Sequence, residues 1–130
     1  MSVQSEPALG RLFQVLGDST RLRIAALLAA TTRGACVCEL TDALAQPQYH
    51  VSRHLKTLRT AGLVVPERDG RWVYYRLIPP SGALGKRLAA LLRTVSADSR
   101  FAGDHERLAK RLALRRHGRC CVWTAGGVVA

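Results

Sequence analysis

The chain has few acidic residues. Nine Asp and Glu stand against 20 Lys and Arg among 130 residues, which gives a formal net charge of +11 and a pI of about 10.8. This excess favours a polyanionic partner, with nucleic acid expected first and an anionic membrane surface second. Residues 81–130 hold ten basic and three acidic residues, a balance of +7, whereas 36–80 carry only +2. For the basic C-terminal part, a solvated helix is favoured slightly over contact with the flanks of bound DNA.

Long apolar runs are also lacking. No stretch approaches the roughly 20 apolar residues that a membrane-spanning helix needs. The first seven residues, MSVQSEP, have neither the basic start nor the apolar centre of a secretory signal. We therefore expect a soluble, cytoplasmic protein without a membrane partner. The length suits one small domain plus a tail, whose limited core a second copy would complete.

Motifs of common enzyme sites are missing as well. The sequence contains no Cys-X-X-Cys in a βαβ context, no nucleophile elbow and no glycine-rich phosphate loop, so we expect no enzyme. Four cysteines in a chain without an export signal favour free thiols, metal ligands or a redox switch over structural disulfides. They form two pairs, Cys36/Cys38 and Cys120/Cys121.

Apolar periodicity predicts several helices. A short helix over 8–17 precedes a buried one that Asp18 or Ser19 caps and that runs to about Ala30. Next come two helices joined by a tight turn at Gln46-Pro47, which is the pattern of a helix-turn-helix. Two further helices follow near the C-terminus. The last four helices are expected over 36–45, 47–61, 81–97 and 104–116.

Two extended runs, 63–68 and 71–77, flank Asp69-Gly70, a dipeptide favoured in type I′ hairpins. The hairpin would form a wing beside the helix-turn-helix. The leucine stripe of 81–97 would suit a dimer interface. The expected fold is therefore mainly α with a β-hairpin wing, a homodimeric winged helix-turn-helix over 1–97, followed by a basic extension over 98–130.

The outer face of the 47–61 helix carries the expected DNA contacts. Gln48, Ser52 and Arg53 lie in its first half, where base edges are usually read. Lys56 and Arg59 lie further along and are expected at phosphates. The remaining candidates are Tyr49 and His50 beside these residues, and Arg71 in the wing as a minor-groove or phosphate contact.

Cys36 and Cys38 lie about ten positions before this helix. Two thiols can bind a soft metal ion, and a metal site this close to a DNA-reading helix could change its affinity for DNA. The pair therefore suggests a metal-responsive repressor. Residues i and i+2 of a regular helix point about 200° apart, so both thiols would reach one ion only if the first turn of the 36–45 helix unwound. That deformation would couple ion binding to DNA affinity. A helix N-terminus lowers cysteine pKa, so both thiols are expected to be partly ionised.

Several motifs, in order from about Leu16 to Leu77, resemble those of the ArsR/SmtB family of winged-helix metalloregulatory repressors. They are Leu16-Gly17-Asp18-Ser19-Thr20-Arg21-Leu22, Cys36-Val37-Cys38-Glu39-Leu40, Gln46-Pro47, Val51-Ser52-Arg53-His54-Leu55, Leu58-Arg59, Ala61-Gly62-Leu63-Val64 and Asp69-Gly70-Arg71-Trp72-Val73-Tyr74-Tyr75-Arg76-Leu77.

The resemblance implies a homodimer, built from the first helix and the helix after the wing. It would bind double-stranded operator DNA, repress its own operon and release the operator on metal binding. The cysteine element resembles the arsenite and antimonite site of the arsenic branch and also that of the cadmium and lead branch. A third cysteine can follow in the arsenic pattern, but position 41 is Thr41. Cys120 or Cys121 is the expected substitute, and no organic cofactor is expected.

Other interpretations remain open at this point. The sensed signal could be cadmium, lead, another thiophilic ion or thiol oxidation, and a thiol redox enzyme, an arsenic carrier or an architectural DNA protein is less favoured. Asp104, His105 and His117 lie near positions where zinc sensors of the family place ligands, but a solvated helix face is favoured for them. His54 is expected to be structural, and Trp72, Tyr74 and Tyr75 to pack the hairpin.

Overall fold

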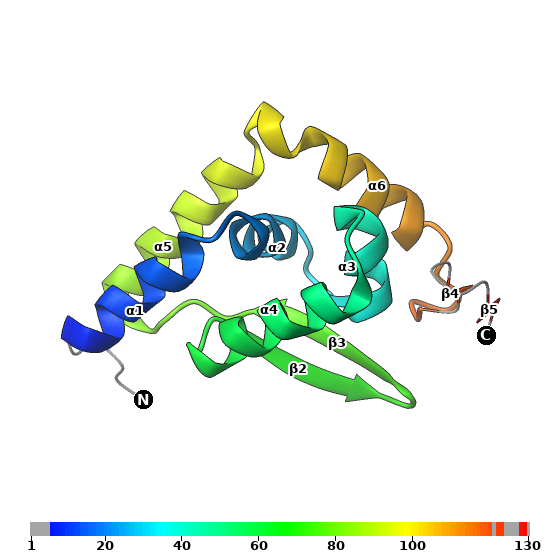
Figure 1. Cartoon of the computed structure of the whole chain (residues 1–130), viewed down its shortest axis with the longest axis horizontal. Coiled ribbons are helices and arrows are strands. Elements are labelled where there is room, and N and C mark those ends of the chain that lie inside the picture. Colours follow the sequence, from blue (N-terminus) through cyan, green and yellow to red (C-terminus); the bar gives the residue numbers. More distant parts are fainter. Residues whose placement is uncertain (1–5, 121, 124–127, 130) are drawn as a thin grey trace.

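A computed structural model describes residues 6–120, 122–123 and 128–129, and Figure 1 shows the arrangement of its helices and strands. None of the described helices combines the length and apolar character needed to cross a bilayer. The elements are α1 (Glu6–Leu16), α2 (Ser19–Ala29), β1 (Ala35–Cys36), α3 (Val37–Leu44), α4 (Gln48–Thr60), β2 (Val64–Asp69), β3 (Trp72–Leu77), α5 (Gly82–Ser96), the 3-10 helix η1 (Ser99–Phe101), α6 (Ala102–Leu112), β4 (Val122–Trp123) and β5 (Val128–Val129).

The helix α2 forms the centre of the core. Asp18 caps it by accepting a hydrogen bond from the Arg21 backbone N–H at 3.0 Å. Residues 24–28 are all buried, because α1, α4, α5 and α6 all pack around α2. The predicted cap and the predicted burial of this helix are both confirmed.

The helix-turn-helix consists of α3 and α4. Ala45 ends α3 with a left-handed φ of 54°, a conformation that costs a non-glycine residue about 1–2 kcal/mol, and Pro47 then caps α4. On α4 the apolar side chains of Val51, Leu55 and Leu58 are buried in the core, as the periodicity predicts. The opposite face of α4 is left to solvent.

The strands β2 and β3 form the predicted wing, but their turn differs from the prediction. Asp69 pairs with Trp72, so the two turn residues are Gly70 and Arg71, one position later than expected. Gly70 has a φ of 63° and Arg71 does not have a positive φ, which corresponds to a II′-like turn with glycine first and not to type I′. The turn shifts because Asp69 continues the strand.

A third strand, β1, joins the wing. It pairs with β3 so that Ala35 lies opposite Tyr75 and Cys36 opposite Tyr74. Gly34 permits this approach, since it has a φ of 75° and a Cβ at this position would lie 2.5 Å from the Tyr75 carbonyl oxygen. The first cysteine is thereby attached directly to the wing.

The helix α5 lies beside α1 (Figure 1). Side chains of both helices line an apolar groove. Leu88 and Leu92 of the predicted leucine stripe are buried within the chain. Leu84 and Leu91 are 37% and 52% exposed, and Phe13 of α1 is 58% exposed. An apolar surface is therefore left uncovered on this side of the chain.

The helix α6 packs against α3, and its inner face is not solvated. Asp104 is 5% exposed and accepts hydrogen bonds from Arg23 at 2.8 Å and from Arg107 at 2.7 Å. Arg111 is 3% exposed. The expectation of a solvated basic helix, and of a solvated face at Asp104, is therefore wrong for this side of α6. Composition alone does not show that its charges are paired within the fold.

The Asp104 pair should support the attachment of α6 to α2. The substitution Asp104→Asn removes the charge that Arg23 and Arg107 neutralise. Breaking a buried ion pair costs about 3–5 kcal/mol, and the partial exposure of Arg23 reduces this, so we expect the free energy of unfolding in urea to fall by about 2 kcal/mol. Glu106→Gln on the same helix breaks only the exposed pair with Lys110 and should have no measurable effect. Equal effects of the two substitutions would contradict this account.

Candidate functional site

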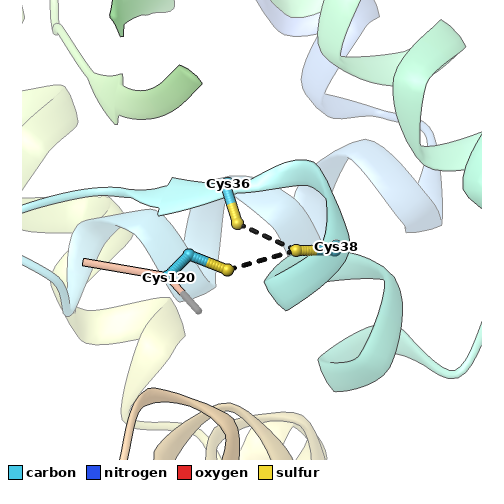
Figure 2. A group of neighbouring side chains, drawn as sticks. All are labelled: Cys36, Cys38 and Cys120. Carbon is cyan, nitrogen blue, oxygen red and sulfur yellow. Dashed lines mark hydrogen bonds between the residues drawn. The ribbon is translucent and has the colours of Figure 1, made fainter. Parts of the chain in front are cut away.

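Three cysteines meet in the interior between α3, β1 and the segment after α6 (Figure 2). The Sγ atoms of Cys36 and Cys38 are 3.1 Å apart, and those of Cys38 and Cys120 are 3.3 Å apart. All three side chains are at most 3% exposed. Of the two candidates for a third thiol, Cys120 joins the pair, and Cys121 lies outside the described residues. We call these three residues the cysteine cluster.

The first two thiols face each other without any unwinding of the helix. Cys36 lies in β1 and is the N-cap of α3, with an extended backbone at φ −85° and ψ 167°, and only Cys38 has helical geometry. The 200° separation of residues i and i+2 applies only within a helix. The predicted start of the helix was one residue early, and the deformation inferred from it is therefore not required for both thiols to reach one ion.

Glu39 and Arg115 fix the approach of the C-terminal segment. The Glu39 carboxylate is fully buried and accepts two hydrogen bonds from Arg115, each of 2.7 Å. It also accepts one from the Cys36 backbone N–H at 3.0 Å. Arg115 donates a further hydrogen bond to the Gly34 carbonyl at 2.9 Å. One carboxylate thus holds both the first cysteine and the segment that leads to the third.

Arg111 lies directly beside the sulfur atoms. Its Nε donates to Asp42 at 2.7 Å, and its Nη2 lies 3.3 Å from the Sγ of Cys38 and 3.6 Å from the Sγ of Cys120. Its Nη1 is buried without a hydrogen-bond partner among the described residues. A buried cation this close favours negative charge on the sulfurs.

Tyr74 covers the cluster from the side of the wing. It is 7% exposed, and its hydroxyl oxygen accepts a hydrogen bond of 2.7 Å from the Cys120 backbone N–H. The Arg115 guanidinium lies 5.1 Å from the centre of its ring, a cation–π distance. The prediction that Tyr74 packs the hairpin is confirmed, but it also contacts the site.

The three thiols differ in acidity. Hydrogen bonds from Cys120 and Cys36, together with Arg111, lower the pKa of Cys38 to about 3. Hydrogen bonds with Cys120 and Cys38, together with burial, raise the pKa of Cys36. A hydrogen bond with Cys36 lowers the pKa of Cys120, but its bond to Cys38 and its burial outweigh this effect and raise that pKa. The expectation of two partly ionised thiols is therefore wrong for Cys36, because its neighbours outweigh the helix N-terminus.

The cluster is suited to a soft, thiophilic ion. Thiolates are the preferred ligands of such ions, and sulfurs bound to one ion by bonds of about 2.3 Å stand roughly 3.5–3.8 Å apart. The three Sγ atoms already lie within 4.8 Å of one another. Within the described part of the chain, no other group of three His, Cys, Asp or Glu residues has this arrangement. Little movement is needed to bind an ion.

Asp104 and His105, the alternative candidates for zinc ligands, do not belong to a group of metal-ligating side chains among the described residues. Asp104 is occupied by Arg23 and Arg107, and His105 makes a 2.9 Å hydrogen bond with the Ser96 hydroxyl. His54 lies 3.3 Å from Arg21, packed against α2, as expected for a structural residue.

The predicted DNA contacts lie on one side of the molecule, where α4 and the wing run together along the lower edge of Figure 1. Arg71 is exposed in the turn of the wing, and its guanidinium lies 5.7 Å from the Trp72 ring centre. His50 is half-buried beside Tyr49. The exposed candidates on α4 are Gln48, Tyr49, Ser52, Arg53, Lys56 and Arg59.

Sequence reasoning missed the residues that surround the thiols, namely Glu39, Asp42, Tyr74, Arg111 and Arg115. A signal was present for the arginines. Arg107, Arg111 and Arg115 recur every four residues and therefore share one helix face, which is more regular than a merely solvated face requires. No local signal identified Tyr74.

Known proteins resemble this chain. The family model described as bacterial regulatory protein, arsR family, matches residues 18–65. The arsenic resistance transcriptional regulator ArsR2 of Pseudomonas putida is 38% identical over 112 residues, which cover 85% of this chain and 95% of the relative. ArsR1 of the same organism is 52% identical over 68 residues, 52% of either chain. The arsenical resistance operon repressor of Escherichia coli is 48% identical over 69 residues, 53% of this chain and 58% of its own. The chain thus spans between half and three-fifths of the latter two relatives.

The acidity pattern predicts one thiolate in the cysteine cluster. Because the pKa of Cys38 is lowered and those of Cys36 and Cys120 are raised, thiolate absorbance in the ultraviolet should correspond to one equivalent from about pH 5 to pH 8 in a Cys121→Ser background, which removes the cysteine outside the described residues. Cys38→Ser should abolish this absorbance, and Arg111→Gln should move its onset to higher pH. A curve that rises only above pH 8, as for free cysteine, would contradict the assignment.

Proposed function

Because the chain belongs to the ArsR family of bacterial regulatory proteins, which are not enzymes, we propose that it is a DNA-binding transcriptional repressor that releases its operator when arsenite or antimonite binds. The observation that carries the proposal is the meeting of Cys36, Cys38 and Cys120 in one buried cluster. Two of the relatives are named for arsenic or arsenical resistance, which supports arsenite or antimonite as the inducer. As an operator-binding protein it would act in the cytoplasm.

The chemistry of trivalent arsenic suits three thiols. Arsenic binds three thiolates in a pyramid and keeps a lone pair on its fourth side, so no fourth ligand is required. On binding of arsenous acid, three As–S bonds form and three As–O bonds break. Three water molecules leave, taking the protons of Cys36 and Cys120 and one from solvent. Cys38, held as a thiolate by hydrogen bonds from Cys120 and Cys36 and by Arg111, is the nucleophile that would form the first bond.

Operator binding would use α4 and the wing. The exposed first half of α4, with Gln48, Ser52 and Arg53, would enter the major groove, while Lys56 and Arg59 would neutralise phosphates. Arg71 in the wing turn would reach a phosphate or the minor groove. The formal charge of +11 would speed the encounter with DNA.

Two copies of the chain would form the DNA-binding unit. The groove between α1 and α5 is lined almost entirely by apolar side chains, and Phe13 and Leu91 are more than half exposed there. Apolar surface of this kind on a small domain is typical of a protein interface. A twofold dimer would place two copies of α4 on successive turns of one face of DNA.

A second candidate function is a response to oxidation, because the sulfur atoms of Cys38 and Cys120 are only 3.3 Å apart. A two-electron oxidant such as hydrogen peroxide would join them in a disulfide, and its two oxygen atoms would leave as two water molecules, which take the proton of Cys120 and one proton from solvent. A dithiol reductant would restore DNA binding in that case. The third candidate function is a repressor that responds to cadmium or lead ions, and a chelator would then restore binding to DNA.

Anisotropy of labelled operator DNA tests the inducer. Arsenite should weaken binding of the native chain by about 5- to 150-fold, the usual range of allosteric coupling. Cys38→Ser and Cys120→Ser should each abolish the response, because two thiols no longer complete the pyramid. Cys121→Ser is the matched control and should respond like the native chain.

Parallel titrations with cadmium, lead and peroxide separate the candidates. Release by a divalent ion at lower concentration than arsenite would make the chain a sensor of that ion. An unchanged response in Cys120→Ser would remove Cys120 from the site.

Substitutions on α4 should separate base reading from phosphate contact. Arg53→Ala should weaken operator binding by about 1–3 kcal/mol and relax the preference at one base pair. Lys56→Ala should weaken binding to all sequences alike and reduce the slope of log K against log salt by about 1. Lys110→Ala, at an exposed position of α6, is the control and should alter neither quantity. A uniform loss in Arg53→Ala would reassign that residue to the backbone.

A further inference from the structure

Tyr74 links the cysteine cluster to the wing. We propose that it is the positioning residue through which inducer binding at the cysteines changes the position of the wing on DNA. This inference rests on the proposed function and names the route by which that site is coupled to the operator.

Two of the three thiol residues contact Tyr74 through the backbone. The Cys120 N–H donates to its hydroxyl at 2.7 Å, and Cys36 lies directly opposite it where β1 pairs with β3. Paired residues in an antiparallel ladder have Cα atoms about 4.5–5.5 Å apart. A change in the distance between Cys36 and Cys120 would therefore act on Tyr74 at two points, its backbone and its hydroxyl.

Tyr74 is also part of the wing. It lies in the middle of β3, opposite Glu67 of β2, and three residues from Arg71 in the turn. Three residues of an extended strand span about 10 Å, so the phenol and the expected DNA contact belong to one short, hydrogen-bonded element. A second link runs beside the first, since Arg119, next to Cys120, pairs with Asp69 of the wing at 3.2 Å.

Ion binding would move Cys120 more than the other two cysteines. Cys36 is fixed by the β1–β3 pairing and by Glu39, and Cys38 lies in the first turn of buried α3. Cys120 lies beyond the end of α6 at Leu112, just after a turn that backbone hydrogen bonds between Arg116 and Arg119 close. The side chains of Arg115 and Tyr74 attach this segment to the rest of the fold. Spreading the sulfurs from 3.1 and 3.3 Å to the roughly 3.5–3.8 Å of an ion-bound set would shift this segment, and its backbone N–H is bonded to Tyr74.

Coupling through Tyr74 differs from coupling through the α3–α4 contact. In the latter case the signal would leave from Cys38 along α3 and would not depend on the Tyr74 hydroxyl. Removing that hydroxyl distinguishes the two routes, because phenylalanine keeps the ring and its contact with Arg115 while losing the bond to Cys120.

The experiment compares the full-length native chain with Tyr74→Phe in three measurements. These are operator affinity without arsenite, arsenite affinity from the ultraviolet As–S absorbance, and operator affinity at saturating arsenite. We expect the first two to stay within about threefold of the native values. The arsenite-induced loss of operator affinity should shrink by about 2- to 12-fold, which corresponds to the 0.5–1.5 kcal/mol of one neutral hydrogen bond.

Tyr75→Phe is the matched control, because it removes a hydroxyl from the next residue of the same strand, opposite Ala35. Its response to arsenite should equal that of the native chain. Arg119→Gln removes the ion pair with Asp69 at an exposed position, and it should also reduce the arsenite-induced loss of operator affinity. This variant can be measured even if Tyr74→Phe proves unstable.

Each outcome has a separate meaning. If the native chain does not respond to arsenite, the proposed function fails and not the route alone. If the native chain responds and Tyr74→Phe responds equally well, the inference is overturned. The signal then passes through the Arg119–Asp69 pair if Arg119→Gln alone responds less, and through α3 and α4 if Arg119→Gln also responds like the native chain. If Tyr74→Phe loses arsenite binding as well, Tyr74 only supports the site and the inference is likewise overturned.

Discussion

Two arginine–carboxylate pairs, one buried and one partly exposed at Asp42, hold the C-terminal segment on α3, and the cysteine cluster depends on them. Arg111 pairs with Asp42 and Arg115 with Glu39, each at 2.7 Å. Such pairs add little net stability, because removing both charges from water offsets most of their attraction. Their bidentate or directional hydrogen bonds do fix geometry, however. Together with the hydrogen bond from the Cys120 backbone N–H to Tyr74, they bring Cys120 across 82 residues of chain to Cys38.

The same charges set the state of the thiols. Arg111 is shared between Asp42 and the sulfurs of Cys38 and Cys120, so one guanidinium stabilises both the Asp42 carboxylate and the negative charge of the cluster. The buried carboxylate of Glu39 lies on the other side, where it accepts from the Cys36 backbone and helps to keep that thiol protonated. One ready nucleophile beside two neutral thiols is an arrangement in which an incoming thiophilic ion finds its first bond without prior rearrangement.

Most of the fold was predictable, because apolar periodicity and turn residues act locally. The helices α1 to α5, the wing and the buried face of α4 follow from such patterns. The errors have local causes too: Cys36 extends into β1 instead of opening α3, and Asp69 extends β2 instead of entering the turn. What the sequence could not indicate is the partner of α6. The regular spacing of Arg107, Arg111 and Arg115 indicates one shared face, but the sequence does not show that the carboxylates of α3 lie opposite it.

The origin of the third thiol bears on how a sensor of this kind works. Thr41 is buried one turn after Cys38, where the arsenic branch can place a cysteine, and its hydroxyl has no hydrogen-bond partner among the described residues. Three ligands within one short helix would bind an ion by distorting that helix. Ligands from β1, α3 and the segment after α6 would instead make a bound ion a bridge between elements that each touch the wing or the helix-turn-helix. Binding energy can then act on the relative positions of these elements while each keeps its own hydrogen bonds.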